Sequence, residues 1–77
     1  MFPLDQLALG QKALINSIET EFLPLKLIEM GCLPGNEISL LYSAPFKDPL
    51  YFKIDQAHLA IRKEVAQYII VKPLLDD

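Results

Sequence analysis

The chain contains very little of what catalysis and disulfide-bonded folds depend on. Its 77 residues include one cysteine, one histidine, three glycines and no tryptophan. A single thiol cannot form an internal disulfide, which excludes a small secreted scaffold held together by bridges. A nucleophilic serine or cysteine needs a base and an orienting group nearby, and one histidine with no surrounding motif does not provide them. We therefore expect a protein that is not an enzyme.

Charge and hydropathy remove further classes of function. The net charge is −3 at pH 7 and the only adjacent basic pair is Arg62-Lys63, so we expect no nucleic-acid partner. The three glycines are scattered and form no phosphate-binding loop. The sequence contains no apolar run of about 18 residues, so it predicts no membrane span. Met1–Asp5 also lacks the basic region of a signal peptide. We expect a cytoplasmic protein that does not insert into the membrane and carries no cofactor.

What the chain does contain is a large apolar fraction, since 52% of its residues are hydrophobic. A chain this short buries only about 60% of its unfolded surface, so its core must be efficient. The composition supports one compact core and predicts a single domain over residues 1–77. The apolar fraction is also high enough to predict a surface patch that a partner would cover.

The segment from Leu27 to Gly35 predicts the end of a helix followed by a turn into a strand. Gly31 lies where the residue after a helix takes a positive φ, which glycine adopts without a steric cost from a Cβ atom. Pro34 and Gly35 are typical turn residues and define where the next strand begins. This segment is the strongest local signal in the chain.

The helix that ends there is predicted over residues 22–30. Pro24 would lie in its first turn, where a missing N–H has no intrahelical partner to lose. Thr20 is the expected N-cap, although no capping box completes it. At 100° per residue, the helix has a broad apolar arc that is larger than one core requires. Its members are Leu23, Leu27, Ile28 and Met30.

Strand signals occupy most of the remaining chain. Apolar and polar residues alternate with period two, and Ile38, Leu40 and Tyr42 share one face of the second strand. A bulge is expected near Asn16-Ser17, because the alternation of the first strand is imperfect there. Short helical turns are expected over residues 3–9 and 63–67, and residues 74–77 are expected to fray. The predicted strands cover residues 11–18, 37–43, 50–55, 58–62 and 68–72.

This element order predicts a mostly β fold. Five short strands with one helix inserted after the first strand, together with short helical turns, are typical of a small antiparallel barrel. Closing the sheet on itself also removes the exposed edges that a short chain cannot otherwise protect.

The metal-ligand candidates are Cys32, Asp55 and His58, and all three are weak. Transition-metal sites need three or four convergent ligands, and the Asp-x-x-His pair formed by Asp55 and His58 has no third ligand at a suitable spacing. A free cysteine usually behaves as a small buried hydrophobe. We therefore interpret Cys32 as a core residue and His58 as a solvent-facing strand residue.

One candidate partner-binding site lies on the predicted helix. Phe22 and Leu25 fall in or beside its polar sector, next to Lys26 and Glu29. Apolar side chains rimmed by charge are the usual composition of an interface. The alternative is that Phe22 and Leu25 pack beneath the N-terminal segment or the C-terminal tail.

A second candidate partner-binding site is the proline-bounded loop that carries Phe46, Lys47 and Asp48. An exposed aromatic ring beside charged residues suits protein recognition. The alternative is that this loop closes the open end of the barrel.

Four motifs follow one another along the chain: Lys26–Gly31, Leu33–Gly35, Ala44–Leu50 and Leu59–Arg62. Their order and spacing resemble those of the FeoA family, the small cytoplasmic accessory proteins of bacterial ferrous iron uptake. The resemblance covers the chain from about Leu4 to Pro73. One departure is Lys47, which stands where the family commonly has a glycine.

The resemblance implies a fold and a partner. The fold it implies is an SH3-like barrel with a helix between the first two strands. The partner it implies is the large membrane ferrous iron permease, which carries a cytoplasmic GTPase domain. Similar domains occur at the C-terminal end of some metal-dependent transcriptional repressors.

Three functional hypotheses follow. The first is an accessory or regulatory protein of ferrous iron uptake that binds the GTPase-bearing permease through the helix and adjacent loops. The runner-up is a free-standing domain that binds or senses a divalent transition metal, as the repressor domains suggest. The third is a module that associates with itself.

Overall fold

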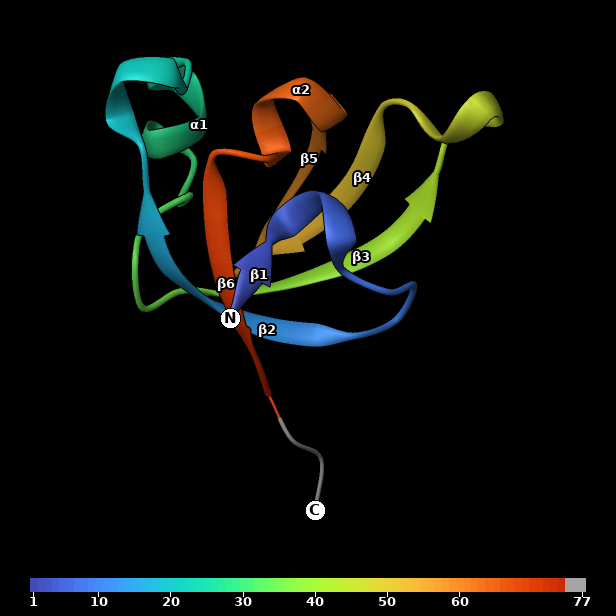
Figure 1. Cartoon of the computed structure of the whole chain (residues 1–77), viewed down its shortest axis with the longest axis horizontal. Helices are drawn as coiled ribbons and strands as arrows, with labels where there is room; N and C mark the ends of the chain where they lie inside the picture. The colour runs from blue at the N-terminus through green and yellow to red at the C-terminus, as the bar shows by residue number, and fades with distance from the viewer. Residues whose placement is uncertain (75–77) are drawn as a thin grey trace.

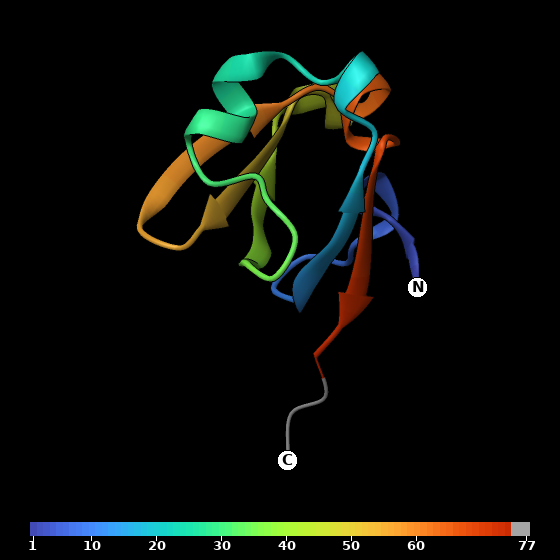
Figure 2. The ribbon, with the colours of Figure 1, turned by 90° about the vertical axis from the view of Figure 1, so that its left-hand side faces the viewer.

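The computed structural model describes residues 1–74 and is built around one six-stranded antiparallel sheet. The sheet order is β1-β6-β2-β3-β4-β5, and the sheet curls around a single core (Figure 1; Figure 2). The mostly β barrel expected from the sequence is therefore confirmed. The strands are β1 Phe2–Pro3, β2 Lys12–Ile18, β3 Glu37–Ser43, β4 Leu50–Ile54, β5 Ala57–Ile61 and β6 Ile69–Pro73.

The expected count of five strands was one too few. The additional strand is β1, in which Phe2 pairs with Val71 and Pro3 with Ile70. Two residues are too few to show a period-two pattern, so no local pattern indicates this strand. The expected fraying of residues 74–77 falls mainly on residues 75–77, which lie outside the described residues. The Leu74 amide donates a hydrogen bond to the carbonyl of Lys12 at 3.0 Å.

The predicted helix over residues 22–30 is wrong in its first part. A 3₁₀ turn comes first, and the α-helix begins only after Pro24. The reason is that a residue before proline avoids the α region, and Leu23 is accordingly extended with φ −104° and ψ 131°. Pro24, not Thr20, is the residue that precedes the helix. The helical elements are η1 Leu4–Gln6, η2 Thr20–Phe22, α1 Leu25–Glu29, η3 Pro45–Lys47 and α2 Lys63–Ala66.

The predicted stop of α1 at Gly31 is confirmed. Gly31 has φ +108°, and its carbonyl accepts a hydrogen bond from the Asn36 side-chain amide at 2.7 Å. The Cys32 amide donates to the Leu27 carbonyl at 3.0 Å, which closes the end of the helix. This geometry turns the chain back toward the barrel and directs Cys32 into the core.

Two β-bulges shape the sheet. The first lies in β2, where the register shifts between Ile15 and Ser17 as expected. The second lies in β3 between Leu40 and Tyr42, and the sequence did not predict it. An extra residue at a bulge reverses the faces beyond it. For this reason Tyr42 is 55% exposed, and the expectation that it shares the face of Ile38 and Leu40 is wrong.

The core fills the inside of the curled sheet. Alternate residues of β4 point inward, and Phe52 is the largest side chain that is completely buried. In β6 it is Ile69 and Val71 that point inward. The 3₁₀ helix η1 adds one buried residue, Leu4, and the α-helix α2 adds another, Ala66. The core lies inside the barrel, and most of α1 lies outside this core.

Candidate partner-binding surface

Helix α1 is attached to the barrel by few side chains. None of its five residues is buried, and Leu27 is a partly buried residue that packs against the core. The buried anchor of this segment is Leu23, which precedes the helix. An amphipathic helix usually buries one face completely. Here a large part of the apolar surface of α1 stays uncovered by residues 1–74.

The two apolar residues of the first candidate site, Phe22 at the end of η2 and Leu25 at the start of α1, are both exposed. Phe22 is 51% exposed and Leu25 is 68% exposed. The Phe22 ring stacks on Tyr68, with ring centroids 4.6 Å apart and planes inclined by 20°. This contact orients the ring but leaves half of it accessible. The alternative in which both residues pack beneath the chain termini is therefore not what residues 1–74 show.

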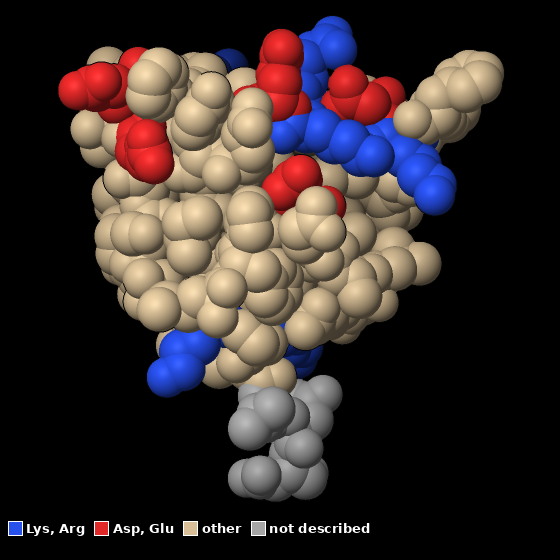
Figure 3. Space-filling model, viewed as in Figure 1, with Lys and Arg blue, Asp and Glu red and all other residues tan. Residues whose placement is uncertain are grey.

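Charged residues rim this apolar surface. Lys26 and Glu29 are both exposed on α1, and neither takes part in an ion pair within the described part of the chain. In Figure 3, acidic side chains flank uncharged atoms at the upper left, where Figure 1 places α1, and a mixed cluster of both charges lies further to the right. Exposed apolar and charged side chains therefore lie close together on this segment, and their role in partner binding stays a prediction.

A groove of about 510 Å³ lies between α1 and strand β5. Its lining is mainly apolar, and its charged or titratable members are Lys26, Arg62 and His58, with no carboxylate among them. Sequence reasoning placed Lys26 on a docking face of the helix but missed the groove, because the proximity of α1 to β5 depends on the sheet order. Its remaining lining residues are Pro24, Leu27, Met30, Leu59, Ala60, Ile61 and Val65.

The second candidate site, at η3, is separate from the first. Figure 1 shows η3 at the upper right and α1 at the upper left, with α2 between them. Phe46 is fully exposed, so it does not close the barrel. Phe46 and Lys47 have φ values of +66° and +64°, which β-carbon-bearing residues rarely adopt. The loop therefore presents an aromatic ring on a strained backbone.

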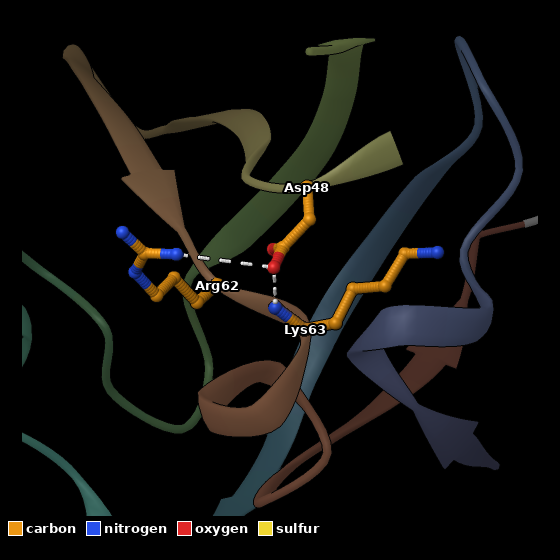
Figure 4. Close-up of polar contacts among 3 residues, drawn as sticks. All are labelled: Asp48, Arg62 and Lys63. Carbon is orange, nitrogen blue, oxygen red and sulfur yellow. Dashed lines mark hydrogen bonds and ion pairs between the residues drawn. The ribbon is translucent and has the colours of Figure 1, made fainter. Parts of the chain in front are cut away.

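Asp48 fixes the base of this loop. One carboxylate oxygen, Oδ1, accepts a hydrogen bond from the Lys63 backbone amide at 3.0 Å. The other, Oδ2, lies 4.0 Å from Nη1 of Arg62 (Figure 4). Both contacts tie η3 to the start of α2. The Asp48 carboxylate is thus bonded within the molecule, whereas the side chains of Phe46 and Lys47 are exposed to solvent.

The metal-ligand candidates do not form a site of three ligands. Cys32 is completely buried, and burial raises the pKa of its thiol to about 11. His58 is exposed on β5 opposite Lys53, and Asp55 is exposed in the turn before it. Across residues 1–74, no group of three or more histidine, cysteine, aspartate or glutamate residues is placed to hold a metal ion. The interpretations of Cys32 as a core residue and of His58 as a solvent-facing residue are confirmed.

None of the helices among the described residues is both long enough and apolar enough to cross a membrane. The longest of them, α1, has five residues. A helix needs about 20 residues to span the hydrocarbon core.

Comparison with known proteins identifies the family. The family model described as the FeoA domain matches residues 2–73. Among curated proteins, a Porphyromonas gingivalis fusion of Fe(2+) transport protein A and Fe(2+) transporter FeoB is 33% identical over 70 residues, which is 90% of this chain and 8% of the fusion. The chain therefore spans only a small part of that relative.

Solved structures agree with this match. The solution structure of iron(II) transport protein A from Clostridium thermocellum has a TM-score of 0.84 and 32% identity, and the match covers 95% of this chain and 46% of that one. Stenotrophomonas maltophilia FeoA complexed with zinc, described as a prokaryotic SH3 domain protein, has a TM-score of 0.80 and 22% identity, covering 94% and 91%. The SH3-like fold is thus confirmed, and the chain belongs to the FeoA family of ferrous iron transport.

Proposed function

We propose that this protein is a cytoplasmic accessory protein that regulates ferrous iron uptake by docking onto the membrane ferrous iron permease, at its cytoplasmic GTPase domain. The observation that carries the proposal is the uncovered apolar surface of α1, with Phe22 and Leu25 exposed beside Lys26 and Glu29. The identity of the partner is supported by the Porphyromonas gingivalis relative, in which the two kinds of protein are one polypeptide.

A fusion of this kind supports a physical association. Joining two domains in one chain raises their effective concentration to about the millimolar range when the linker is short. Even a weak contact between separate proteins becomes well populated under that condition. Docking between separate polypeptides needs apolar contact area, and the exposed side chains Phe22 and Leu25 provide area of that kind.

Docking is sufficient to regulate the permease. If the domain binds one state of the nucleotide cycle more tightly than another, it shifts the population toward that state. Coupling free energies in such systems are typically about 1–3 kcal/mol, or roughly 5- to 150-fold in an equilibrium constant. No catalytic group on the domain is needed for that effect.

The contribution of Leu25 can be estimated from its exposure. Complete burial of a leucine side chain stabilises a complex by about 1.5–3 kcal/mol. Because Leu25 is 68% exposed in the free domain, covering it would contribute about 1–2 kcal/mol. Replacement by aspartate would remove this contribution and add the cost of desolvating a charge.

The test is the affinity of Leu25→Asp for the GTPase domain of the permease from the same organism, measured by titration calorimetry. We expect the variant to bind at least about tenfold more weakly, since 1.4 kcal/mol corresponds to a factor of ten. Leu9→Asp is the matched control, because Leu9 is 70% exposed and lies in the segment between η1 and β2, away from α1 (Figure 1). Circular dichroism verifies that both variants are folded. A folded Leu25→Asp that binds as tightly as the parent would show that the α1 surface is not the docking site.

The two other hypotheses are separated by simple measurements. Localised NMR shifts on titration with a divalent metal ion would favour metal sensing, and the described residues offer no cluster of three ligands in its support. Sedimentation equilibrium would reveal self-association. We retain docking onto the permease as the proposed function, because the uncovered apolar surface at α1 supports a docking role.

A further inference from the structure

The two edges of the sheet differ in how they are protected. Strand β1, at one edge, has two residues and one of them is a proline, so it offers little to a pairing strand. Strand β5, at the other edge, has five residues, contains no proline and pairs with β4 without a bulge. Edge strands are normally shortened, charged, bulged or covered, because their free backbone groups attract other strands. β5 has none of the first three protections.

The backbone of β5 is bonded on one side only. Among residues 1–74, no backbone hydrogen bond joins Ala57–Ile61 to any segment other than β4. Ile54 and Ala57 close the two-residue turn between the strands, and the bonded pairs alternate from there along an antiparallel ladder. The N–H and C=O groups of Ala57, Leu59 and Ile61 therefore face β4. Those of His58 and Ala60 face the open edge.

The groove beside α1 runs along this same edge. It is lined by every residue from His58 to Arg62. Side chains of a strand alternate between its two faces, so a hollow that touches five consecutive residues lies beside the strand and not on one face. The opposite wall is formed by Pro24, Leu27 and Met30. The free backbone groups of His58 and Ala60 thus open into a groove with an apolar far wall.

The lining determines what the groove can hold. Its apolar residues suit apolar side chains, and Lys26, Arg62 and His58 form a rim without any carboxylate. Arg62 is only loosely engaged, since its ion pair with Asp48 is 4.0 Å long and exposed. Such a rim is complementary to acidic side chains. A volume of about 510 Å³ is also within the range of about 300–1,000 Å³ of specific binding pockets.

We infer that the groove takes an extended polypeptide segment of the permease, rich in apolar and acidic residues, which pairs with β5 as an added strand. The backbone groups of His58 and Ala60 supply main-chain hydrogen bonds, and Lys26 and Arg62 select acidic side chains. This inference rests on the proposed function for the identity of the partner. The chemistry assigned to the groove follows from its lining residues and does not depend on the proposed function.

The chemistry of the groove is tested with a defined peptide. The probe is a capped seven-residue peptide that alternates valine with aspartate or glutamate, titrated into the isotopically labelled protein. We expect saturable NMR shifts along β5 and at least tenfold slower amide exchange at His58 and Ala60. A peptide with lysine in place of its acidic residues is expected to bind at least tenfold more weakly. Equal binding of the two peptides would overturn the assigned preference for acidic side chains.

Backbone methylation of the peptide isolates strand pairing. Methylating the amides on one edge removes hydrogen-bond donors without changing the side chains, and we expect at least a tenfold loss of affinity for one of the two possible edges. If the affinity stays unchanged when one edge is methylated and also when the other edge is methylated, the peptide does not add as a strand and the inference is wrong.

A variant of the protein tests the same bond from the other side. Ala60→Pro removes an edge-facing N–H without removing a bond to β4, which is where prolines are tolerated in sheets. Ala60→Val retains the N–H and is the matched control. We expect at least a tenfold loss for Ala60→Pro alone, with the peptide and with the GTPase domain. If Ala60→Pro does not fold, the methylated peptides still decide the question.

The two proposals fail in different ways. If the parent protein binds the GTPase domain and the folded Ala60→Pro variant binds it equally well, strand addition is refuted while the docking function stands. If the parent does not bind the GTPase domain, the docking function is refuted, and with it the identity of the partner. The peptide experiments then report on the groove alone.

Discussion

The buried thiol of Cys32 predicts a specific loss of stability in alkaline solution. Cys32 is completely buried, and the desolvation caused by this burial raises the pKa of its thiol from 9.0 to about 11. Burial disfavours the charged thiolate relative to the neutral thiol. In the unfolded chain the same thiol ionises near its ordinary pKa, so the two states bind different numbers of protons between these two values.

The sign and size of the effect follow from linkage. Between about pH 9 and pH 11 the unfolded state has lost the thiol proton while the folded state retains it, so the free energy of unfolding falls as the pH rises. A difference of about two pKa units corresponds to about 2–3 kcal/mol at about 1.4 kcal/mol per unit. Below pH 9 the thiol is neutral in both states and contributes no pH dependence. For a domain of this size, about 2–3 kcal/mol lowers Tm by roughly 10–20 °C.

The assay compares the parent with Cys32→Ala by denaturant unfolding from pH 7 to pH 10.5. Other groups titrate over this range in both proteins, so the difference between the two curves isolates the thiol. We expect Cys32→Ala to be less stable at pH 7, because it leaves a cavity, and to lose less stability as the pH rises. Parallel curves for the two proteins would refute the reasoning, since they would mean that the thiol ionises equally in both states.

The remaining predictions concern the turn after α1 and the base of the η3 loop. Gly31→Ala is expected to destabilise the fold by about 1–2 kcal/mol in thermal unfolding, because φ is +108° and alanine avoids positive φ. The added Cβ would lie 3.5 Å from Ile54, an ordinary contact, so a larger loss would show that sterics dominate. Asp48→Ala is expected to cost about 1 kcal/mol and to speed amide exchange at Lys63, whereas Asp48→Asn retains an acceptor and should behave like the parent in exchange. Unchanged exchange in Asp48→Ala would remove Asp48 from its role at the loop base.

The same thiol bears on the metal-sensing hypothesis. A cysteine binds a transition metal as the thiolate, and metal affinity falls when the proton is hard to remove. With its pKa raised to about 11, the Cys32 thiol is neutral at physiological pH. Its position in the core, behind the turn that ends α1, explains why a residue that can ligate a metal acts here as a small hydrophobe.

Local patterns were enough to predict most strands and the end of α1. Leu50, Phe52 and Ile54 alternate with polar residues, and a one-sided strand must place such residues in the core, as β4 does. Gly31 was predictable because few other residues adopt its backbone conformation. These features depend on neighbours in the sequence, so the sequence alone determines them.

The errors arose where a local pattern was too short or was overridden. Strand β1 has two residues, and only its pairing with β6 identifies it. Tyr42 points outward because a bulge precedes it, and the alternating pattern continues through the bulge without a visible break. The start of α1 was different, because Pro24 restricts the backbone of Leu23 and this restriction follows from the sequence alone.

The candidate site was predictable in part for the same reason. The exposure of Leu25 follows from its angular position on a helix of known period, whereas Phe22 is exposed although it lies in η2, before α1 begins. The groove along β5 was not predictable, because it requires knowing that β5 is an edge strand and that α1 lies across from it. Both facts belong to the sheet order, which no local pattern contains.

The weak attachment of α1 connects the fold to the proposed docking. A helix of five residues is far too short to be stable alone, and Pro24 provides no side-chain cap for it. Its order depends on Leu23 and Leu27 packing against the core and on the bond from Cys32 to Leu27. Elements with few buried contacts lie at the low-stability end of a protein, where binding has the largest effect on order. A partner seated in the groove would touch α1 and β5 together, and so would hold the helix in place from the side that the core does not reach.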